Sequence, residues 1–514
     1  NVDIRYNTLS TPGDWVIYKY WSGENPWDNS GIFIGNTINA ANNGMSIRYY
    51  HNLQVDSNLV HVTGIGIQTD YSQNMLCRDN LIDGNHSIGF HSRECDGAVF
   101  TRNNVRFSRD YGYYFNNSDN INFAENKFFF SGSDHWVVGV YGDNSRYSLY
   151  ENNSIVFSDS LGESSSWHGF YYMRNSTFTG NRITNWTNSQ GQHCGFQAMY
   201  DSHFEDNYVY LRSNGGDPSE RGAFSGNGNT SINDTLILGS STQGYYGNDW
   251  TIRGAIIDAP NSNNNYAAIE CRGGILEVDD VMISNSYMGI YGTGVGGHIR
   301  NTLIDVYGSN YGIKIENNST MSMYKNTVVG SDVGTGIWSE TNATISTNSN
   351  IVDGFATGLL ANSQNTVQTS VFSNNTINFT GTDLPPQVGD VVTVNANADP
   401  SDIYGNIFLD PQFVHPDTGN YALQAISPAI NAGDIDSLDL DGTVADIGVH
   451  FYNFGYVPMD MVADSTGDGY VALSWDIISS DSIQHFIPYY KLEGSGTWLS
   501  ASTTTNSHTI ISGL

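Results

Sequence analysis

The chain has 514 residues, and 52 acidic residues against 20 lysines and arginines give it a formal net charge of −32. Such an acidic surface repels nucleic-acid phosphates and anionic lipid headgroups, so the composition argues against binding to nucleic acid or to a membrane surface. With 13% aromatic residues and a regular apolar pattern, the chain is also unlike the acidic sequences that remain disordered.

No segment approaches the roughly 20 consecutive apolar residues that span a membrane, so we expect no membrane insertion. The four cysteines are too few for a disulfide framework and lack the spacing of metal ligands. Cys77 and Cys271 fall on apolar positions of the repeat described next, which predicts buried free thiols. Residue 1 already lies inside this repeat, and we therefore expect more sequence before it.

A short pattern recurs through residues 1–380: an apolar residue, two polar residues, an asparagine, any residue and a second apolar residue. It starts at Ile4-Arg-Tyr-Asn7-Thr-Leu9 and, from position 36 onward, returns every 20 to 28 residues. Four repeats carry another residue in place of the asparagine. The predicted positions are Asn7, Asn36, Asn58, Asn80, Asn103, Asn126, Asn153, Asn181, Asn207, Thr235, Ala255, Val281, Thr302, Asn326, Asn350 and Asn375.

Short strands separated by Gly, Asn, Asp and Ser at this period are typical of a parallel β-helix, in which each repeat forms one rung. Stacked asparagine side chains would satisfy the backbone groups of a buried turn and bond to the next rung. Rungs lie roughly 4.8 Å apart, so sixteen of them would form a rod about 70 Å long. The crossover rule makes the coil right-handed.

In this repeat the sequence resembles the right-handed parallel β-helix superfamily, which includes pectate lyases, alginate epimerases and many bacterial surface proteins. The resemblance covers roughly residues 1–380 and implies an all-β, right-handed parallel β-helix (solenoid) in a secreted protein. It implies the fold more than an activity, because enzymes, tailspikes and adhesins share this scaffold.

Residues 381–455 lose the period, which predicts a segment that leaves the coil and then closes it. Asp410-Pro-Gln-Phe413 and Ala445-Asp446-Ile447-Gly448 resemble the closing segment of secreted bacterial β-helix proteins. A cap over the last rung is expected, because an open strand edge would pair with other chains.

The closing segment contains an acidic loop, residues 434–442, in which aspartates alternate with other residues before a glycine. Such a loop can place oxygen atoms around Ca²⁺, although the closing glutamate of an EF-hand is missing. Carboxylates this close repel one another unless a cation lies among them, and a solvated acidic loop is the alternative. The predicted calcium ligands are Asp434, Asp436, Asp439, Asp441 and Asp446, and no organic cofactor is expected.

Residues 456–514 change pattern again. Tyr470-Val-Ala-Leu-Ser-Trp475 alternates like a half-buried strand, and further short apolar runs follow it. These segments resemble the first half of a fibronectin type III domain, an Ig-like β-sandwich, with Trp475 in its core. Such sandwiches need about 100 residues, so we expect the module to continue beyond residue 514.

About ten residues after each asparagine position comes a small residue followed by an apolar one, as in Gly89-Phe90 and Gly169-Phe170. Strand alternation turns this apolar residue inward and the next one outward. The predicted outward column is Ser46, Gly66, His91, Tyr114, Tyr141, Tyr171, Gln197, Ser225, Tyr246, Glu270, Tyr291, Lys314 and Trp338. A second column, two residues further on, contains Arg48, Gln68, Arg93, Asn116, Asp143, Met173 and Arg272.

Folding does not require an exposed aromatic column such as this one. Stacked rings would offer flat apolar faces to sugar rings, and arginine would grip uronate carboxylates with two hydrogen bonds. The alternative is that tyrosine is favoured on sheet surfaces and packs on its neighbours there. The predicted substrate-binding residues are Arg48, Tyr114, Tyr171, Tyr246, Tyr291 and Trp338.

Catalysis would need more than binding. A uronate lyase or epimerase needs a cation beside the carboxylate and a base for the adjacent proton. An inverting hydrolase would need two carboxylates about 6.5–9.5 Å apart, for which Asp134 with Asp143 is the candidate pair. The sequence motifs of pectate lyases, alginate epimerases and polygalacturonases are missing, which favours a protein that is not an enzyme. The predicted catalytic set, if there is one, is His91, Arg93, Tyr141, Asp143 and His168.

The sequence favours an extracellular β-helix that binds or organises polysaccharide as an adhesin or scaffold, held at the cell surface by sequence outside this chain. Its partner would be a polysaccharide or a cell-surface glycan. One alternative is a polysaccharide lyase or epimerase acting on uronate-containing glycans. Another is a subunit of an extracellular filament or sheath, in which the aromatic column contacts further copies of the chain.

Overall fold

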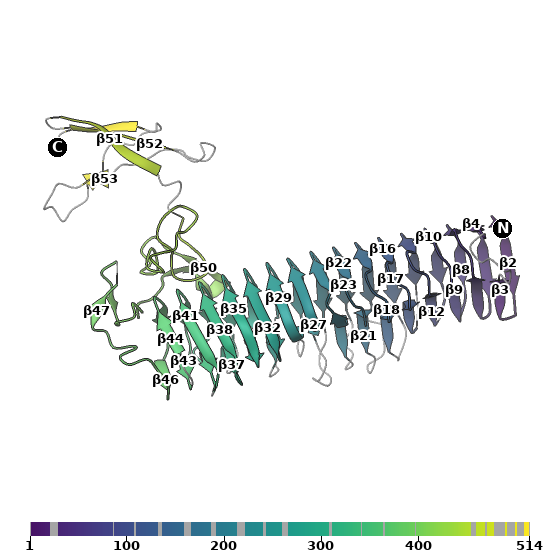
Figure 1. Ribbon diagram of the computed structural model, residues 1–514, viewed down its shortest axis with the longest axis horizontal. Helices are drawn as coiled ribbons and strands as arrows, with labels where there is room; N and C mark the ends of the chain where they lie inside the picture. Colours follow the sequence, from purple (N-terminus) through teal and green to yellow (C-terminus); the bar gives the residue numbers. More distant parts are fainter. Residues whose placement is uncertain are drawn as a thin grey trace.

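The computed structural model is an all-β molecule in which a parallel β-helix forms a long rod (Figure 1). It describes residues 2–512 apart from residues 21–28, 86, 107–108, 132–135, 159–165, 187–191, 213–221, 240–242, 260–265, 308–310, 341, 363–364, 396, 454–458, 468–469, 477–488, 491–498 and 501–507. The described residues form strands and turns, with a single 3-10 helix, η2 (Pro416–Thr418). No helix long and apolar enough to cross a membrane occurs among them.

Each rung contributes strands to three faces, and neighbouring rungs pair in parallel. The first face precedes the asparagine turn and consists of β1 (Val2–Arg5), β4 (Gly31–Ile34), β7 (Leu53–Asp56), β10 (Leu76–Arg78), β13 (Val99–Thr101), β16 (Asn122–Ala124), β19 (Leu149–Glu151), β22 (Thr177–Thr179), β25 (His203–Glu205), β32 (Gly274–Asp279), β35 (Val295–Arg300), β38 (Thr320–Tyr324), β41 (Thr344–Asn348) and β44 (Asn365–Gln368).

The second face follows the asparagine turn and is a 16-stranded sheet whose strand order follows the chain, which confirms the predicted number of rungs. Its strands are β2 (Thr8–Thr11), β5 (Thr37–Ala40), β8 (Leu59–His61), β11 (Leu81–Asp83), β14 (Asn104–Arg106), β17 (Lys127–Phe130), β20 (Ser154–Phe157), β23 (Arg182–Asn185), β26 (Tyr208–Leu211), β28 (Thr235–Leu238), β30 (Ile256–Asp258), β33 (Met282–Ser286), β36 (Leu303–Val306), β39 (Thr327–Val329), β42 (Ile351–Asp353) and β45 (Val371–Ser373).

The third face completes each rung. Its strands are β3 (Trp15–Tyr20), β6 (Asn43–Arg48), β9 (Ile65–Asp70), β12 (Ile88–Arg93), β15 (Tyr111–Asn116), β18 (Val137–Asp143), β21 (Trp167–Tyr171), β24 (His193–Tyr200), β27 (Gly222–Ile232), β29 (Gln243–Arg253), β31 (Ala267–Cys271), β34 (Met288–Thr293), β37 (Tyr311–Glu316), β40 (Thr335–Ser339), β43 (Thr357–Ala361) and β46 (Ile377–Gly381). The long strands β27 and β29 run on into the first face, so the first and third faces form one 30-stranded sheet.

The asparagine turn forms the predicted ladder. Where asparagines follow one another on successive rungs, the Oδ1 atom of one accepts hydrogen bonds from the backbone N–H and the Nδ2 of the asparagine one rung earlier, as between Asn103 and Asn126 at 3.0 Å each. The residue before each ladder position is left-handed, with φ of 54° at Arg102 and 56° at Glu125. This turn fixes the register of neighbouring rungs, because a one-residue slip would move the asparagine out of it.

Two predicted ladder positions are wrong. Asp234, not Thr235, accepts the hydrogen bond of the Asn207 N–H, at 2.7 Å, because Asn233 is the left-handed residue of that turn. Ser370 takes the place predicted for Asn375, since its Oγ accepts from the Asn350 N–H at 3.2 Å. The ladder residue lies one residue before Thr235 and five residues before Asn375, and the spacing of the repeats alone does not reveal either shift.

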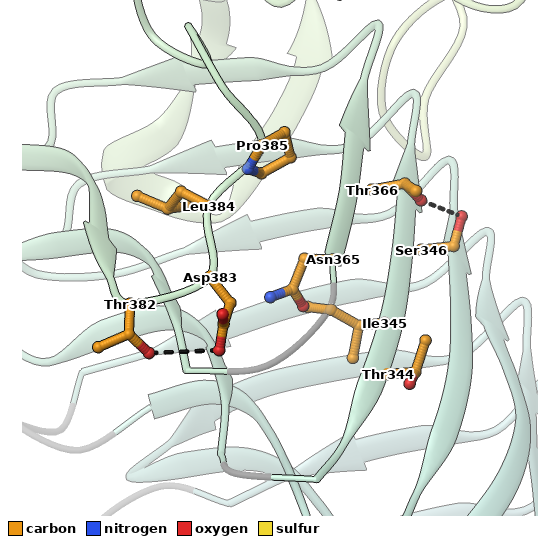
Figure 2. Close-up of a pocket in the computed structure, with 9 residues that line it drawn as sticks. All are labelled: Thr344, Ile345, Ser346, Asn365, Thr366, Thr382, Asp383, Leu384 and Pro385. Atoms are coloured by element: carbon orange, nitrogen blue, oxygen red, sulfur yellow. Dashed lines mark hydrogen bonds between the residues drawn. The ribbon is translucent and has the colours of Figure 1, made fainter.

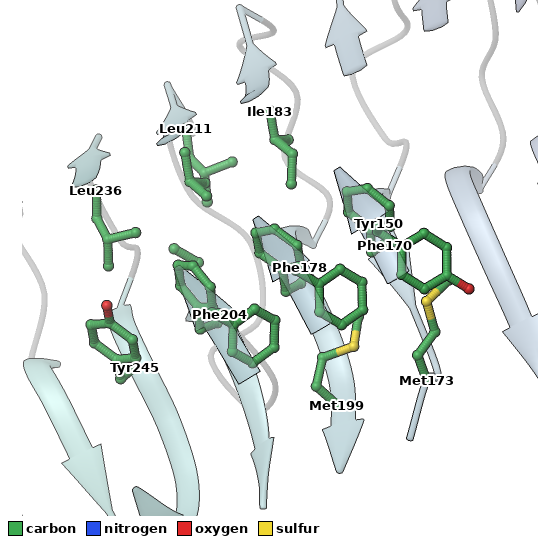
Figure 3. Packing of buried hydrophobic residues seen from close by; sticks show 14 of the residues in the cluster. Tyr150, Phe170, Met173, Phe178, Ile183, Met199, Phe204, Leu211, Leu236 and Tyr245 are labelled. Carbon is green, nitrogen blue, oxygen red and sulfur yellow. The ribbon is translucent and has the colours of Figure 1, made fainter. Parts of the chain in front are cut away.

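The rod is filled by stacked apolar and aromatic side chains (Figure 3), including the parallel pairs Tyr150–Phe178 and Phe170–Phe196. All four cysteines are buried and free, which confirms the prediction for Cys77 and Cys271. Along the third face a column of small residues, mostly glycine, faces inward beside this core. It consists of Gly44, Gly66, Gly89, Gly112, Gly139, Gly169, Gly195, Ala223, Gly244, Ala268, Gly289, Gly312, Gly336 and Gly358.

Replacement of a glycine in this column is expected to destabilise the rod. A Cβ at Gly139 would lie 2.5 Å from the Gly169 carbonyl oxygen and 2.7 Å from Ile155 Cδ1, so Gly139→Ala should cost about 2 kcal/mol through overpacking. Thermal unfolding followed by circular dichroism measures the loss. Gly296→Ala is the matched control, because its nearest neighbour would be 3.9 Å away, and equal melting of the two variants would contradict the prediction.

After β46 the chain leaves the coil and returns to it. Residues 382–409 include the short strands β47 (Thr393–Val394) and β48 (Pro400–Ser401), and Leu384, Val388 and Phe408 pack against the core of the rod. Asn406 adds a further ladder position, because its Oδ1 accepts from the Ser370 N–H at 3.1 Å. This segment thus covers the last rung.

The next segment packs on the side of the rod rather than on its end. It contains β49 (Phe413–His415), η2 and β50 (Asn420–Leu423). A second apolar cluster joins Phe413, Tyr421 and Ile447 to Leu303 and Ile351 on the outer side of the second face. The predicted cap is therefore divided into a part that closes the coil and a part that lies along it.

Residues 456–514 contain β51 (Met459–Gly467), β52 (Tyr470–Asp476) and β55 (His508–Ser512), which form an antiparallel three-stranded sheet, and the paired β53 (Tyr489–Tyr490) and β54 (Leu499–Ser500). Trp475 is buried. Much of this region lies outside the described residues, so the fibronectin type III module stays a prediction, as do the predicted domain boundaries.

Candidate functional site

The outward column of the third face exists, with one correction. Strand pairing places Gln68, His91, Tyr114 and Tyr141 on successive rungs. Gly66, predicted for this column, belongs instead to the buried glycine column, because the strand has two consecutive inward residues at each glycine–apolar pair. The column continues through Tyr171, Gln197, Ser225, Tyr246, Glu270, Tyr291, Lys314 and Trp338.

The neighbouring column contains Arg48, Asp70, Arg93, Asn116 and Asp143 on five successive rungs. Two predictions for this column are wrong. Gln68 lies in the first column, as described above, and Met173 is fully buried in the core of the rod. Asp70 was not predicted for this column, because the predicted column counted outward positions from Gly66, which lies inside the rod.

Four rings of the first column stack directly on one another. Ring centroids are 5.1 Å apart for His91–Tyr114, 5.1 Å for Tyr114–Tyr141 and 5.3 Å for Tyr141–Tyr171, with interplanar angles of 21°, 7° and 17°. The stack runs along the rod, so the flat faces of its inner rings cover one another. The expectation that these rings turn flat faces to the solvent is therefore wrong, and they present edges and hydroxyl groups instead.

Trp136 lies against this stack and was not among the predicted site residues. It makes perpendicular contacts with Tyr111, at 90° and 5.7 Å between centroids, and with Tyr171, at 89° and 5.4 Å. Its side chain remains 38% exposed, although four aromatic rings surround it. Trp136 directly precedes β18 and belongs to neither column, so no periodic signal in the sequence could have identified it.

Two arginines at one end of the stack hold a buried carboxylate. Asp70, whose side chain is fully buried, lies 3.1 Å from Arg48 Nε and 3.5 Å from Arg93 Nη2, and Gln68 Nε2 donates to it at 2.9 Å. The Arg93 guanidinium also lies over the Tyr71 ring, 4.8 Å from its centroid. Two guanidinium groups against one carboxylate leave a local excess of positive charge on an otherwise acidic chain.

The protonation states of the column limit its chemistry. Burial, followed by the charges of Arg93 and Arg48, lowers the pKa of His91 against the opposing effect of Asp70, so its imidazole is neutral at pH 7. Burial and the Asp143 carboxylate raise the pKa of Tyr141 to about 12. With this raised pKa, Tyr141 stays protonated at neutral pH and is suited to donating and accepting hydrogen bonds rather than to removing a proton.

Asp143 is occupied by its neighbours. Asn116 Nδ2 donates to its Oδ2 at 2.8 Å, and the Tyr114 hydroxyl donates to the same atom at 3.2 Å. Asp134, the predicted carboxylate partner of Asp143, lies outside the described residues. The pair required by an inverting hydrolase is therefore untested.

His168 is 1% exposed, and burial and the neighbouring His193 lower its pKa to about 3. Its ring packs against Trp136 and Tyr171. This placement argues against the catalytic role predicted for His168, because its imidazole cannot reach a substrate in solvent. The outward strand position that the sequence indicates is covered by other side chains.

The column differs in character further along the rod. Arg272 Nη2 lies 2.5 Å from Glu270 Oε1, and Lys314 Nζ lies 2.9 Å from Glu316 Oε2. The Lys314 ammonium also lies over the Trp338 ring, 4.3 Å from its centroid. Arg272 lies 5.4 Å from the Tyr246 ring centroid, and Lys314 lies 5.9 Å from that of Tyr291. The predicted binding residues Tyr246, Tyr291 and Trp338 thus belong to a network of ion pairs and cation–π contacts.

The acidic loop is partly neutralised by the rod itself. Lys325 Nζ lies 2.5 Å from Asp439 Oδ1, and Asp446 accepts the backbone N–H groups of Asn431 and Tyr452. In the described part of the chain, no three His, Cys, Asp or Glu side chains are placed to hold a metal ion. Lys325 thus neutralises Asp439, and calcium binding by Asp434, Asp436, Asp439, Asp441 and Asp446 stays a prediction.

A hollow of about 660 Å³ lies away from these columns, between β41, β44 and the start of the closing segment (Figure 2). Threonine, serine and asparagine side chains line much of it, together with Asp383, Leu384 and Pro385. None of the predicted site residues lies there.

A family model described as periplasmic copper-binding protein (NosD) matches residues 7–164. No curated protein matches the chain. Among solved structures, the catalytic domain of a GH87 α-1,3-glucanase in complex with tetrasaccharides is similar, at 16% identity and a TM-score of 0.30 over 63% of this chain and 64% of that one. The chain thus spans less than two thirds of the glucanase domain.

The tailspike protein of E. coli bacteriophage HK620 in complex with a pentasaccharide is 12% identical, with a TM-score of 0.26 over 73% of this chain and 71% of that one. Pectate lyase Pel9A is 14% identical, with a TM-score of 0.25 over 82% and 89%. At these similarities the structures carry no conclusion about activity.

Those residues of the matched region that the structure describes do not fit a copper site. Copper(I) prefers thiolate, thioether and imidazole ligands. Burial raises the pKa of Cys95 to about 12 and that of Cys77 further, so both remain thiols, and Met45 and Met75 are buried in the core. The described histidines of this region, His51, His61 and His91, form no metal-binding group with each other or with acidic residues.

Proposed function

We propose that the protein acts outside the cytoplasm as a β-helix that binds polysaccharide on the N-terminal half of its third face, as an adhesin or scaffold. The observation that carries this proposal is the run of stacked rings, tyrosine hydroxyls and paired arginines on successive rungs, from Arg48 to Tyr171. The tyrosine hydroxyls complement the O–H groups of sugars, and the arginine pair complements their carboxylates. The match of residues 7–164 to a family described as periplasmic supports export of the chain.

A long face of rungs stacked in register favours a polymer as the partner. Each rung adds a weak contact, and linked weak contacts raise the overall affinity without strong individual sites. Attachment of the protein to a cell surface, through sequence beyond this chain, belongs to the same proposal.

A polysaccharide lyase or epimerase is the second candidate, and one observation favours it. His91 is a neutral imidazole beside Arg48 and Arg93, and a base next to cationic groups is what proton abstraction beside a carboxylate requires. A lyase would release unsaturated sugars that absorb in the ultraviolet, whereas a binding protein would retain the polymer unchanged. Absorbance during incubation with polygalacturonate or alginate separates the two.

Native affinity electrophoresis in gels containing polygalacturonate, alginate, xylan or β-glucan tests the binding proposal. We expect at least one polymer to retard the chain, and the double variant Tyr114→Ala, Tyr141→Ala to lose at least about tenfold in affinity, or about 1.4 kcal/mol. Tyr208→Ala is the matched control, because Tyr208 lies on the second face beneath Arg182, whose guanidinium is 4.0 Å from the ring centroid.

A wild-type chain that none of the four polymers retards would contradict the proposal. Equal loss in the Tyr208 control would also contradict it, since binding would then not depend on the third face. Concentration-dependent sedimentation without any retardation would favour the filament hypothesis instead.

A further inference from the structure

The middle rings of the tyrosine stack expose no flat face to the solvent. Tyr141 lies between Tyr114 and Tyr171, at interplanar angles of 7° and 17°, so both faces of its ring are covered. The solvent meets the edge of this ring. A sugar ring packs best on a flat apolar face, which an edge does not provide.

Trp136 supplies the missing face. Its ring is 75° from the plane of Tyr141, with centroids 6.3 Å apart. Because both faces of Tyr141 are covered, Trp136 can meet only the edge of that ring, and it does so with its own indole face. The side chain remains 38% exposed, so part of the indole ring is accessible to the solvent.

Other tryptophans of the described chain are placed differently. Trp167 and Trp250 are buried, and Lys314 covers Trp338. Trp186 is 43% exposed but packs on Tyr210 beside the second face, with centroids 4.7 Å apart. Trp136 is therefore the exposed tryptophan that lies on the tyrosine column.

We infer that the outward indole face of Trp136 is the stacking surface for one pyranose ring of the bound polysaccharide. The inference rests on the proposed function and adds its ring-binding subsite. The bound ring lies with its plane along the rod, since the indole is perpendicular to the stacked rings, and with its apolar C–H face on Trp136. Hydroxyls of the tyrosine column then lie within reach of the hydroxyls at the rim of the sugar.

The tyrosine stack has a second role in this arrangement. Tyr111, Tyr141, Tyr171 and His168 contact Trp136 from several directions and fix the orientation of the indole. A preoriented ring loses less conformational freedom when the sugar binds, which improves affinity. Tyr111 and His168 thus act as positioning residues.

The test uses the full chain and whichever of polygalacturonate, alginate, xylan and β-glucan retards the wild type most strongly. Trp136→Ala should weaken binding at least tenfold, whereas Trp136→Phe, which keeps a flat ring, should retain most of the affinity. Trp186→Ala is the matched control, as an exposed tryptophan on another face, and it should bind like the wild type. Melting temperatures of the three variants verify that each is folded.

The outcomes separate the inference from the function on which it rests. If the wild type and Trp136→Ala bind equally while the Tyr114, Tyr141 double variant binds weakly, the inference is wrong and the proposed function stands. A loss in Trp136→Phe as large as that in Trp136→Ala also overturns it, because the flat ring would then not matter. Failure of the wild type to bind any polymer overturns both.

Discussion

Asn126→Ala is expected to destabilise the rod by about 4 kcal/mol, because the substitution leaves several buried hydrogen-bonding groups unpaired at once. Asn126 Oδ1 accepts from the N–H and the Nδ2 of Asn103, at 3.0 Å each. Its Nδ2 donates to the Phe100 carbonyl at 2.9 Å and to Asn153 Oδ1 at 3.1 Å. Alanine removes all four contacts and admits no water into a buried turn.

Denaturant unfolding followed by circular dichroism measures this loss. Asn122→Ala is the matched control, because Asn122 lies on the same rung in β16 with its side chain exposed. If Asn126→Ala and Asn122→Ala unfold at the same denaturant concentration, the ladder sets the register of the rungs but adds little to the free energy of unfolding.

The ladder itself shows when an interruption is tolerated. Ala255 and Val281, both buried, occupy two successive ladder positions, and the hydrogen bonds resume where the Thr302 N–H donates to Asn326. Asp234, the ladder residue before them, bonds to Ser231 in place of the next rung. A single alanine between Asn103 and Asn153 leaves the Asn103 side chain facing an apolar partner, which is why its cost is large.

Asp234→Asn is expected to stabilise the protein at alkaline pH and to have little effect at acidic pH. Asp234 occupies a ladder position, where its Oδ1 accepts from the N–H and Nδ2 of Asn207, and Ser231 Oγ donates to its Oδ2 at 2.5 Å. Burial raises the pKa of Asp234 to about 7, and the carboxylate of Asp206 adds to this effect. The buried site therefore favours the neutral carboxyl.

The sign of the pH dependence follows from this raised pKa. Below the ordinary value of 3.8 the carboxyl is neutral in both states and folding gains the full benefit of the ladder. As the pH rises towards 7, the unfolded chain ionises while the folded chain stays neutral, and stability falls by about 4 kcal/mol. Above pH 7 the loss is complete, and the asparagine variant avoids it.

Melting temperatures of the wild type and Asp234→Asn at pH 5 and pH 8 measure the effect. The gain from the substitution should be larger at pH 8. Asp201→Asn is the control, because Asp201 is exposed and does not contribute to the raised pKa of Asp234, so its effect should be the same at both pH values. A gain of equal size at both pH values would mean that Asp234 does not titrate in this range.

Stability and the candidate site are linked through the ladder. The rings of His91, Tyr114, Tyr141 and Tyr171 stack because their rungs are in register, and the asparagine turn sets that register. Loss of the ladder in these rungs should therefore also disturb the binding face. The column of buried glycines also supports this register, because a side chain there would clash with the carbonyl oxygen of the next strand.

The sequence by itself determined the β-helix, the number of its rungs and the alignment of His91, Tyr114 and Tyr141 in one column. These features repeat with a fixed period, and a period in the sequence becomes a stack in space whenever each rung buries the same positions. The ladder of asparagines and the buried thiols followed for the same reason.

Only the tertiary structure decided which residues are accessible and how the rings are oriented. It placed Gly66 and Met173 inside, covered His168, set Asp70 between Arg48 and Arg93, and turned the tyrosine faces onto one another. The contacts of Trp136 with Tyr141 and of Lys325 with Asp439 join positions that the repeat does not relate to one another. Burial and ring orientation depend on neighbours from other rungs and segments, and a one-dimensional pattern contains no information about those neighbours.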